Sequence, residues 1–407
     1  MCGNPVGERS DLRVEIPRID QLIRTQEKLG RIDRPAIEEI QLGKLNALLK
    51  REKQRGGFYR DLPERLGSLS ELSGLPFTTD EDLAQNAGGL LLCSQAEIQR
   101  ILSDATSGTT GAAKRVFYTE GDCRRTVELF MAGLGELVFP GSVTMICFPF
   151  SGPFGLGELI AEAIEGLDAR PLKLGAGLSY GEFREVMEKE QPDTFVGMPV
   201  QLLSILRACG KGSLKRALVS GDSCPASVIS GCEDILGSRL FPHYGSREMA
   251  LGGAICCPAH SGMHLRENHV IAEIVHAAGE PLPAGETGEL VITTIGMEAM
   301  PLIRYRTGDI TRIIPGRCAC GSWVARLDTV RRTEADEMLR LDELLFQTKE
   351  IVDFRAERIG EKLRLTVLTT GEEAPDLPVP AEIRHRRVQP GDRTLYAGKR
   401  KIIREDG

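Results

Sequence analysis

The sequence lacks several features that would assign it to whole classes of protein. No apolar run approaches the roughly 18 residues of a membrane-spanning helix, and the polar start MCGNPVGERS has no apolar signal segment. A basic stripe is also missing, because the net charge is −7, the pI is about 5.6 and the basic residues are scattered among acids. The runs RHRR (384–387) and GKRK (398–401) are short exceptions. We therefore expect a cytoplasmic protein that has neither a membrane nor a nucleic acid as partner.

The chain also lacks a disulfide framework, internal repeats and long low-complexity segments. Its 11 cysteines are too sparse and irregular over 407 residues for a disulfide scaffold, so most are expected to be reduced thiols. With 41% hydrophobic residues the chain can bury a large core. Its length favours one large domain, which we place at 1–332, and a small C-terminal domain at 333–407.

Local patterns predict an α/β protein. The first forty residues are charged and show no pattern, whereas IEEIQLGKLNALLKREKQ (37–54) has the apolar spacing of an amphipathic helix. Between 141 and 240, strands such as SVTMICFPF alternate with helices such as FGLGELIAEAIEG, which is typical of a mostly parallel sheet. HVIAEIVHA and GELVITTI then predict a β-rich, antiparallel or barrel-like part, and LRLTVLTT predicts a strand in an α+β tail.

The segment DATSGTTGAAK (104–114) is the most informative motif. Gly108 and Gly111 remove side chains that would keep a backbone away from an anion, and Lys114 adds a cation. Hydroxyl donors come from Thr106, Ser107, Thr109 and Thr110. The mononucleotide pattern G-x-x-x-x-G-K-[ST] is absent, so a different kind of nucleotide enzyme is implied. A plain Ser/Thr/Gly surface turn is the alternative, but such turns seldom carry so many donors together with a lysine.

Further motifs occur in a recognisable order. They are FYRDLPERL, LPFTTDEDL, TSGTTGAAK, VSGDSCP, YGSRE, GMHLRENHVIAEIV, GETGELVITTIGMEAMPLIRYRTGDITRI and RCACG. Over roughly 40–338 the chain thus resembles the adenylate-forming acyl ligases, and within them the phenylacetate-CoA ligase branch. The resemblance implies an AMP-binding large domain and a small mobile C-terminal domain. It also implies attack of a carboxylate on the α-phosphate of ATP, followed by capture of the acyl-adenylate by a thiol.

The resemblance assigns roles around the nucleotide. Glu248 would hold Mg²⁺ against the phosphates, and Tyr244 with Gly245 would flank the adenine. Asp309 would accept hydrogen bonds from both ribose hydroxyls. Arg247 stands where the family has a Thr or Ser, and Ser246 lies one residue early. The arginine either neutralises the α-phosphate or points into solvent.

The adenine and acyl pockets are assigned by the same resemblance. Adenine would lie at the VSGDSCP turn, with Ser220, Gly221 and Asp222, and Arg326 is also assigned to nucleotide binding. The acyl group would lie near Phe150, Phe154 and Gly155. Two phenylalanines suit an aromatic or otherwise apolar acid, although both residues fit a plain core position equally well.

A cysteine and histidine set matches a structural zinc site of this branch. The expected ligands are Cys257, His264, Cys318 and Cys320, which would form a closed tetrahedral site with no catalytic water. Cys256 and His260 are second-ranked competitors. Reduced buried cysteines without metal are the alternative.

The C-terminal part departs from the family pattern. Lys399 matches the lysine that enters the site for adenylation, with Lys401 as the alternative, and the small domain would swing between two poses. Asp336 would be the hinge, with Glu334 where an arginine is expected. The family's glycine-containing loop after the hinge, which approaches coenzyme A, is missing from MLRLDELLFQTKEI.

Three functions follow from these observations. The first is an acyl- or aryl-CoA ligase that uses ATP, Mg²⁺ and CoA, carries a structural zinc ion and acts on a small carboxylic acid, with a homodimer as candidate assembly. The second is an adenylating enzyme that passes the acyl group to a carrier-protein thiol or an amine. The third is a non-catalytic nucleotide-binding protein on the same fold. Lys399, Glu248 and Asp309 favour an enzyme.

Overall fold

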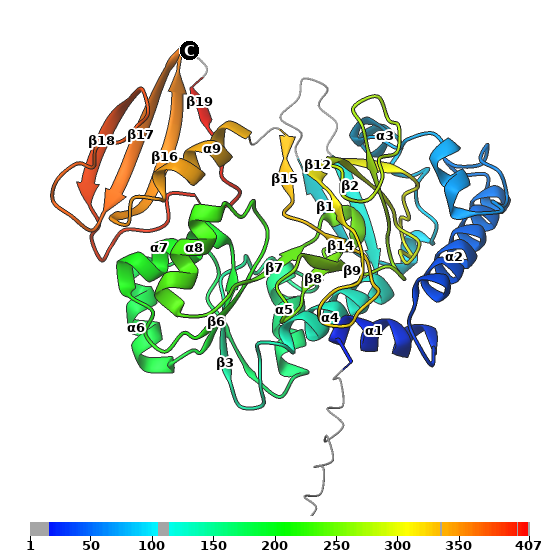
Figure 1. The fold of residues 1–407 in the computed structure, drawn as a ribbon, viewed down its shortest axis with the longest axis horizontal. Helices are drawn as coiled ribbons and strands as arrows, with labels where there is room; N and C mark the ends of the chain where they lie inside the picture. The colour runs from blue at the N-terminus through cyan, green and yellow to red at the C-terminus, as the bar shows by residue number, and fades with distance from the viewer. Residues whose placement is uncertain (1–15, 105–113, 334–335, 397, 406–407) are drawn as a thin grey trace, which may run out of the picture.

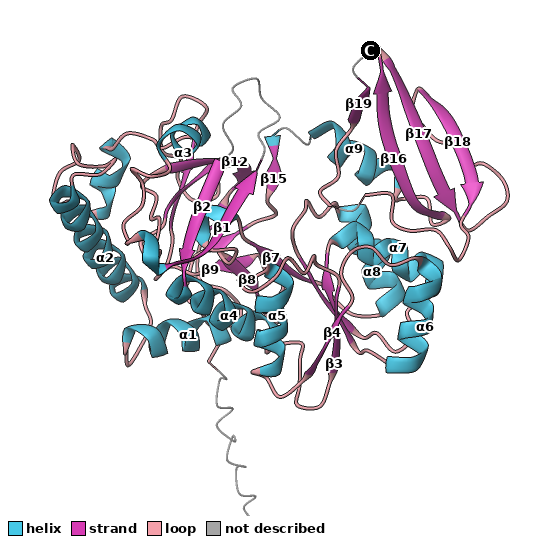
Figure 2. Cartoon of the chain, turned by 180° about the vertical axis from the view of Figure 1, so that it is seen from behind, coloured by secondary structure: helices cyan, strands magenta, loops and turns pink. Residues whose placement is uncertain are grey.

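A nine-stranded mixed sheet forms the centre of the large domain (Figures 1 and 2). The computed structural model describes residues 16–104, 114–333, 336–396 and 398–405. The strand order is β13-β14-β9-β8-β7-β6-β5-β3-β4, parallel from β4 to β7 and antiparallel from β7 onward. The strands are β3 (Val143–Ile146), β4 (Arg170–Lys173), β5 (Thr194–Gly197), β6 (Arg216–Val219), β7 (Phe241–Tyr244), β8 (Ala254–Cys256), β9 (Met263–Leu265), β13 (Ile313–Ile314) and β14 (Arg326–Leu327).

Helices connect the parallel strands, as the alternating pattern predicted. They are α5 (Leu156–Glu165), α6 (Tyr180–Glu190), α7 (Pro199–Cys209) and α8 (Ala226–Leu236), preceded by α4 (Glu120–Leu134). Thr119 and Asp122 form a capping box on α4, and Ser179 and Glu182 form one on α6. These reciprocal hydrogen bonds satisfy backbone donors that a helix start otherwise leaves unpaired. The predicted α/β fold with a mostly parallel sheet is therefore confirmed.

Antiparallel strands form the β-rich part of the large domain. One sheet has the order β10-β11-β12-β15, and a separate hairpin pairs β1 with β2. The bounds are β1 (Ile98–Asp104), β2 (Lys114–Thr119), β10 (Ile271–Val275), β11 (Gly288–Thr293), β12 (Tyr305–Thr311) and β15 (Arg331–Arg332). The short 3-10 helices are η1 (Leu69–Gly74), η2 (Gln95–Glu97) and η3 (Arg247–Met249). Tyr305 and Asp309 both lie on β12, so one strand carries two positions of the LIRYRTGD motif into the interior.

The N-terminal part is more helical than the sequence indicated. The prediction of no pattern in the first forty residues was wrong, because α1 (Arg18–Glu27) lies there. Ile19 and Ile23 are buried in a cluster that includes Leu129 of α4. The helix is short and rich in charge, so tertiary packing determines it more than propensity does.

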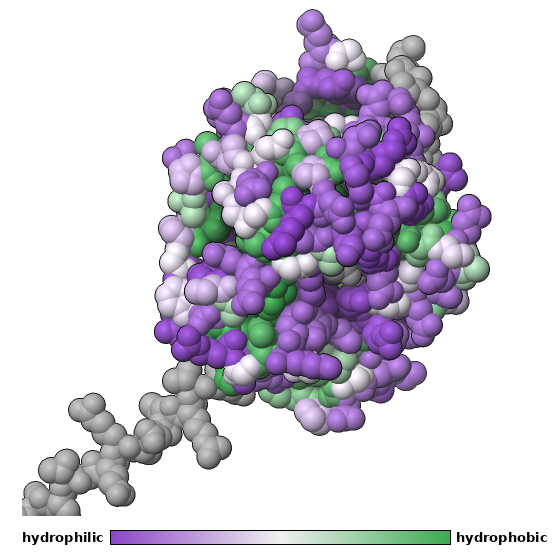
Figure 3. All heavy atoms as spheres, turned by 90° about the vertical axis from the view of Figure 1, so that its right-hand side faces the viewer, coloured by the Kyte–Doolittle hydropathy of each residue, from purple (hydrophilic) through white to green (hydrophobic). Residues whose placement is uncertain are grey.

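The predicted amphipathic helix is present as α2 (Arg34–Arg55), and α3 (Asp80–Asn86) follows it. Asp33 caps α2 by accepting a hydrogen bond from the Ala36 amide at 3.1 Å. Gly56 ends the helix with φ of 69°, a left-handed conformation that glycine adopts without strain. Figure 3 shows that the side of the molecule that carries α2 is covered mainly by hydrophilic side chains.

The C-terminal unit packs on helices of the large domain. It consists of α9 (Asp336–Leu345) and a sheet of order β18-β17-β16-β19, with β16 (Ile351–Ile359), β17 (Lys362–Thr369), β18 (Ala381–Arg387) and β19 (Ile403–Glu405). Figure 1 shows this sheet directly above α7 and α8. One hydrophobic cluster includes Leu203 and Leu206 of α7 together with Leu345, Phe354 and Leu365 of the C-terminal unit. The two parts therefore share a core.

No helix in the described ranges is both long and apolar enough to cross a membrane.

Candidate active site

The glycine-rich loop of the predicted phosphate-binding motif, from Thr106 to Gly111, lies outside the described residues. Its flanks are the paired strands β1 and β2, with Asp104 opposite Lys114. The antiparallel hairpin thus brings both ends of the loop together, next to β12 through Tyr305. Lys114, the last residue of the motif, begins β2.

Lys114 lies in a buried polar cluster with Glu248. Its Nζ is 2.5 Å from Glu248 Oε1, 2.8 Å from Asp80 Oδ1 and 2.7 Å from Tyr305 Oη. Burial disfavours the ammonium ion, but Glu248 and Asp80 outweigh burial and raise the pKa of Lys114. Glu248 itself is only 6% exposed on η3. A charged lysine and a carboxylate therefore face each other where the phosphate loop ends.

Ser246 and Arg247 occupy the two positions before this carboxylate. Ser246 borders a cavity between the large domain and the C-terminal unit, here called the main cavity. The Oγ of Ser246 is buried without a hydrogen-bond partner among the described residues. Arg247 is half-buried, and its carbonyl accepts a hydrogen bond from Tyr118 Oη at 2.6 Å. Ser246 is among the described residues that border this cavity, whereas Arg247 is not.

A cavity of about 410 Å³ lies between the large domain and the C-terminal unit. Its lining residues include Gly221, Asp222, Ser223, His243, Tyr244, Gly245, Ser246, Asp309, Val330, Arg331, Arg332, Glu337, Met338, Lys399, Arg400, Lys401, Ile402 and Arg404. Cationic side chains outnumber acidic ones in this wall, which favours an anionic ligand. A second cavity of about 240 Å³ adjoins it, because Asp222, His243, Tyr244 and Val330 border both.

Asp309 and Tyr244 meet in the main cavity. Tyr244 ends β7 and donates its hydroxyl to Asp309 Oδ2 at 2.7 Å. Arg332, paired with Asp309 across β12 and β15, has its Nε 3.5 Å from Asp309 Oδ1. Burial raises the pKa of Asp309, while Tyr244 and Arg332 oppose the increase. Asp309 is thus a buried carboxylate with one oxygen in a hydrogen bond and the other near a guanidinium.

The turn after β6 supplies a further part of the cavity wall. Gly221 has φ of 88°, and a Cβ there would lie 3.0 Å from the Phe148 ring, so both conformation and space favour glycine. Asp222 accepts hydrogen bonds from the amides of Ser223 and Arg400, both at 2.8 Å. Ser220 lies beside the cavity, where its Oγ is 2.8 Å from His243 Nδ1.

Lys399 borders the same cavity from the C-terminal unit, and so does Lys401. Lys399 keeps much of its side chain exposed. Partial desolvation in the cavity wall and the nearby Arg332 lower its pKa, whereas Asp222 and Asp309 act in the opposite direction. The structure therefore brings the predicted lysine to the predicted carboxylates.

Four arginines of the cavity wall were absent from the sequence-based assignment. They are Arg331, Arg332, Arg400 and Arg404. The first two lie in DTVRRTEADEML, which was interpreted only as a displaced hinge motif. The doubled arginine was the available signal, since two adjacent cations that follow the strand of the predicted ribose ligand Asp309 favour an anionic ligand nearby.

Other assigned residues lie away from the cavity. The Arg326 guanidinium donates to Ser261 and to the carbonyls of Pro315 and Gly316, because its strand, β14, pairs with β9 near one edge of the nine-stranded sheet. Phe150 and Phe154 are half-buried and pack against the main core, and Gly155 caps α5. None of these four is among the described residues that border either cavity.

The four expected zinc ligands converge. Ligand atoms of Cys257, His264, Cys318 and Cys320 all lie within 4.8 Å of one another. Cys257 Sγ is 3.8 Å from Cys318 Sγ, and Cys320 Sγ is 3.5 Å from His264 Nε2. With Zn–S near 2.3 Å and Zn–N near 2.0 Å, tetrahedral geometry puts such atoms about 3.8 and about 3.5 Å apart. The donor set and its spacing therefore fit zinc.

The competing ligands pair with each other instead. Cys256 Sγ is 3.8 Å from His260 Nδ1, and neither residue belongs to the four-ligand cluster. Cys256 lies on β8, where successive side chains point to opposite faces, so it and Cys257 diverge.

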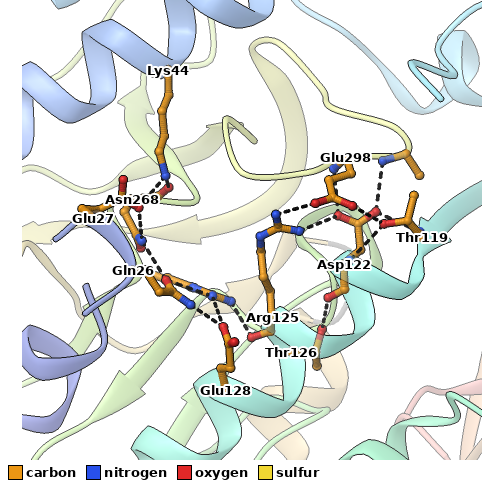
Figure 4. Close-up of polar contacts among 12 residues, drawn as sticks. Gln26, Glu27, Lys44, Thr119, Asp122, Arg125, Thr126, Glu128, Asn268 and Glu298 are labelled. Atoms are coloured by element: carbon orange, nitrogen blue, oxygen red, sulfur yellow. Dashed lines mark hydrogen bonds and ion pairs between the residues drawn. The ribbon is translucent and has the colours of Figure 1, made fainter. Parts of the chain in front are cut away.

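Polar contacts join Asp122 and Arg125 of α4 to Glu298 (Figure 4). Asp122 of α4 accepts a hydrogen bond from the Glu298 amide at 2.8 Å. One turn further, Thr126 donates its hydroxyl to the Ala250 carbonyl at 2.6 Å. Since Ala250 lies two residues after Glu248, α4 fixes the backbone that presents this carboxylate.

Comparisons with known proteins relate the chain to a family of enzymes. Residues 105–299 match the family model of the AMP-binding enzymes. The chain is 28% identical to the phenylacetate-coenzyme A ligase of Thermus thermophilus over 77% of this chain and 74% of the relative. It is likewise 28% identical to the phenylacetate-coenzyme A ligase of Escherichia coli, over 77% of this chain and 76% of the relative.

A solved structure matches the whole fold. A 2-hydroxyisobutyryl-CoA ligase in the postadenylation state superposes with a TM-score of 0.75 at 18% identity, covering 99% of this chain and 94% of that one. The match of residues 105–299 to the AMP-binding enzymes and the similarity to these relatives confirm the resemblance to adenylate-forming ligases that the motifs indicated, and the fold is the same as that of the solved ligase. Within that class the chain is similar to the phenylacetate-coenzyme A ligases.

Proposed function

We propose that the protein activates a carboxylic acid with ATP, forms an acyl-adenylate and transfers the acyl group to the thiol of coenzyme A. The observation that carries this proposal is the main cavity, where Tyr244, Asp309, Asp222 and Lys399 meet from distant segments beneath a cationic wall. Similarity to phenylacetate-coenzyme A ligases supports the reaction class.

The residues have chemistry suited to an adenylate. Asp309 accepts hydrogen bonds, so its carboxylate is suited to the ribose hydroxyls once they replace Tyr244 Oη. The Lys399 ammonium and Arg332 border the cavity, where they would stabilise charge on the α-phosphate while the carboxylate attacks it and pyrophosphate leaves. Preorganised donors of this kind act most strongly in a site from which water is excluded.

Mg²⁺ is the expected cation at the phosphates, whose charge it would neutralise when bound. Glu248 is the residue that would hold it. The buried carboxylate now faces Lys114 at 2.5 Å, so the lysine must turn toward the nucleotide phosphates before Glu248 can bind a cation. Pairing with Glu248 and contact with the phosphates are both consistent with a lysine at the end of a phosphate-binding loop.

Exchange of labelled pyrophosphate into ATP tests the adenylation step. We expect exchange that depends on an added carboxylic acid, with phenylacetate, benzoate and short hydroxy acids in the panel. Lys399→Ala should lower the exchange rate by about two to three orders of magnitude, the usual cost of one preorganised donor. If ATP binds measurably but none of the acids in the panel supports exchange, the non-catalytic alternative is favoured.

The identity of the acid is proposed as aromatic or otherwise apolar. The relatives support this class, because they are named phenylacetate-coenzyme A ligases. The panel above ranks the acids directly through their kcat/KM values.

A second acceptor is favoured by one observation. Where the family resemblance places a glycine-containing loop, this chain forms α9, which packs on α8 through Ser227 and Glu343 at 3.1 Å. The chain thus lacks the flexible surface expected to approach coenzyme A. We therefore also propose transfer to a carrier-protein thiol or an amine, and brisk acyl-CoA formation from free coenzyme A would exclude that alternative.

A structural zinc ion on Cys257, His264, Cys318 and Cys320 is part of the proposal, supported by the ligand spacing. The cytoplasmic location and the homodimer remain predictions, which fractionation and light scattering can check.

A further inference from the structure

Arg400, the residue directly after Lys399, is buried and fully paired. Only 7% of it is exposed. Its Nε is 2.9 Å from Asp342 Oδ1, its Nη1 is 2.8 Å from Asp353 Oδ1, and its Nη2 is 3.0 Å from the Phe354 carbonyl oxygen. These partners belong to α9 and β16, so one guanidinium joins the helix and the sheet of the C-terminal unit.

Aromatic rings enclose the same guanidinium. Its Cζ lies 4.6 Å from the ring centroids of Phe354 and Tyr396 and 5.4 Å from that of Phe346. A buried charge is costly unless it is paired and hydrogen-bonded. Because every direction of the planar fork has a partner, the side chain has a single orientation that a flexible ammonium cannot reproduce.

The backbone of Arg400 is fixed as well, but to the large domain. Its amide donates to Asp222 Oδ2 at 2.8 Å, and Asp222 lies in the turn that lines the nucleotide cavity. Lys399, in contrast, makes no hydrogen bond or ion pair with any residue that the structure describes. The position of Lys399 at the cavity therefore depends on the backbone. The neighbouring Arg400 fixes that backbone in two ways, through its amide to Asp222 and through its guanidinium to Asp342 and Asp353.

We propose that Arg400 is a positioning residue that holds Lys399 at the nucleotide cavity through Asp342, Asp353 and Asp222. This inference rests on the proposed adenylation reaction. Lys399 supplies the charge, and Arg400 supplies its location. A misplacement of about 1 Å by a residue outside the chemistry can lower a rate about 100-fold, so anchoring of this kind has a measurable effect.

The test compares Arg400→Lys with wild type in the two half-reactions. The variant keeps the charge but loses the fork. We expect pyrophosphate exchange to fall about 10- to 100-fold in kcat, with little change in the KM for ATP. Conversion of synthetic acyl-adenylate with the thiol acceptor should stay within about twofold of wild type, because thiol capture does not use Lys399.

A matched control is Arg207→Lys. Arg207 of α7 donates to the carbonyls of Phe346, Thr348 and Ile351, so it also ties the C-terminal unit to the large domain, but it does not border the cavity. This control should lower stability without a selective loss of exchange. Equal losses in both variants, or a parallel loss of both half-reactions in Arg400→Lys, would overturn the proposal.

Two further measurements keep the test decisive. If Arg400→Lys does not fold, Asp342→Asn retains the shape of one partner and should still lower exchange several-fold while leaving thiol capture unchanged. Protection of Lys399 by ATP against acetylation, read by mass spectrometry, needs no turnover. Protection in wild type that is lost in Asp342→Asn supports the proposal even if no acid in the panel is a substrate, and undiminished protection contradicts it.

Discussion

At the scale of single residues, Asp309 is the position on which nucleotide binding should depend most. Asp309→Ala removes a carboxylate suited to two charge-assisted hydrogen bonds, so we expect the Kd for ATP to rise at least about 100-fold, or about 3 kcal/mol. Tyr244→Phe is the matched control, since it removes only the hydroxyl that donates to Asp309 at 2.7 Å. Calorimetric titration with ATP measures both, and unchanged binding in Asp309→Ala would remove the ribose assignment.

A second prediction concerns Glu52, a fully buried glutamate at the end of α2. Neither carboxylate oxygen has a hydrogen-bond partner among the described residues. Burial raises the pKa of Glu52 to about 7 from its ordinary value of 4.5, although Arg55 and Arg51 oppose the increase. Between pH 4.5 and about 7, Glu52 of the folded protein holds a proton that the unfolded chain has released. Stability should therefore fall as pH rises from about 4.5 to about 7.

Glu52→Gln should remove this pH dependence. At pH 8 the variant is expected to be more stable than wild type by on the order of 1–3 kcal/mol, whereas at pH 5 the two should be similar. Urea unfolding at both pH values gives the comparison. Glu39→Gln, at an exposed position of the same helix, serves as control. If Glu52→Gln and wild type have the same pH profile, the carboxylate is not neutral in the folded protein.

At the scale of elements, the cysteine cluster should join two loops through a metal ion. The cluster links the turn between β8 and β9, with Cys257, to the loop before β14, with Cys318. We expect about one equivalent of zinc per chain, and a lower melting temperature after chelation, because ligand binding is coupled to loop folding. Atomic absorption and thermal unfolding measure these quantities.

Single-cysteine variants separate the ligands from their neighbours. Cys318→Ser should lose the metal, whereas Cys256→Ser should keep it, because Cys256 lies beside His260 and outside the cluster. Metal retained in Cys318→Ser and lost in Cys256→Ser would reverse the assignment of ligands.

At the scale of the whole molecule, the shared core makes the C-terminal unit and the helices α7 and α8 one folding unit. Leu345→Ala should cost about 2–5 kcal/mol, because Leu345 is fully buried in that core. Hydrogen exchange should then show lower protection in α7 and α8 as well as in β16. Leu83→Ala, in the other large cluster, is the control and should leave the C-terminal amides protected.

The same core bears on domain movement. The family resemblance implies that the small domain swings between two poses, and in this arrangement a swing would separate Leu203 and Leu206 from Leu345 and Phe354. It would also break the hydrogen bonds from Arg207 to the C-terminal backbone. Movement of the C-terminal unit would therefore expose buried apolar surface, which costs free energy. This is a physical reason to test the acceptor step separately from adenylation.

The sequence by itself determined the local elements and the class of chemistry. Alternating and helical periodicity are properties of short windows, so α2, the parallel strands and the β-rich part were predictable. The ordered motifs identified the ligase class, and the ligand types at Cys257, His264, Cys318 and Cys320 indicated a closed zinc site that the structure brings together.

Only the tertiary structure decided which neighbouring residue faces the cavity. Arg326 points away and Arg332 approaches Asp309, because β14 pairs with β9 in the nine-stranded sheet whereas β15 pairs with β12 in the four-stranded sheet. In GKRK, the Lys399 side chain is exposed at the cavity, whereas the Arg400 guanidinium is buried. Asp342 of α9 and Asp353 of β16 converge on that guanidinium. Such choices depend on partners dozens of residues away, and a local pattern carries no information about them.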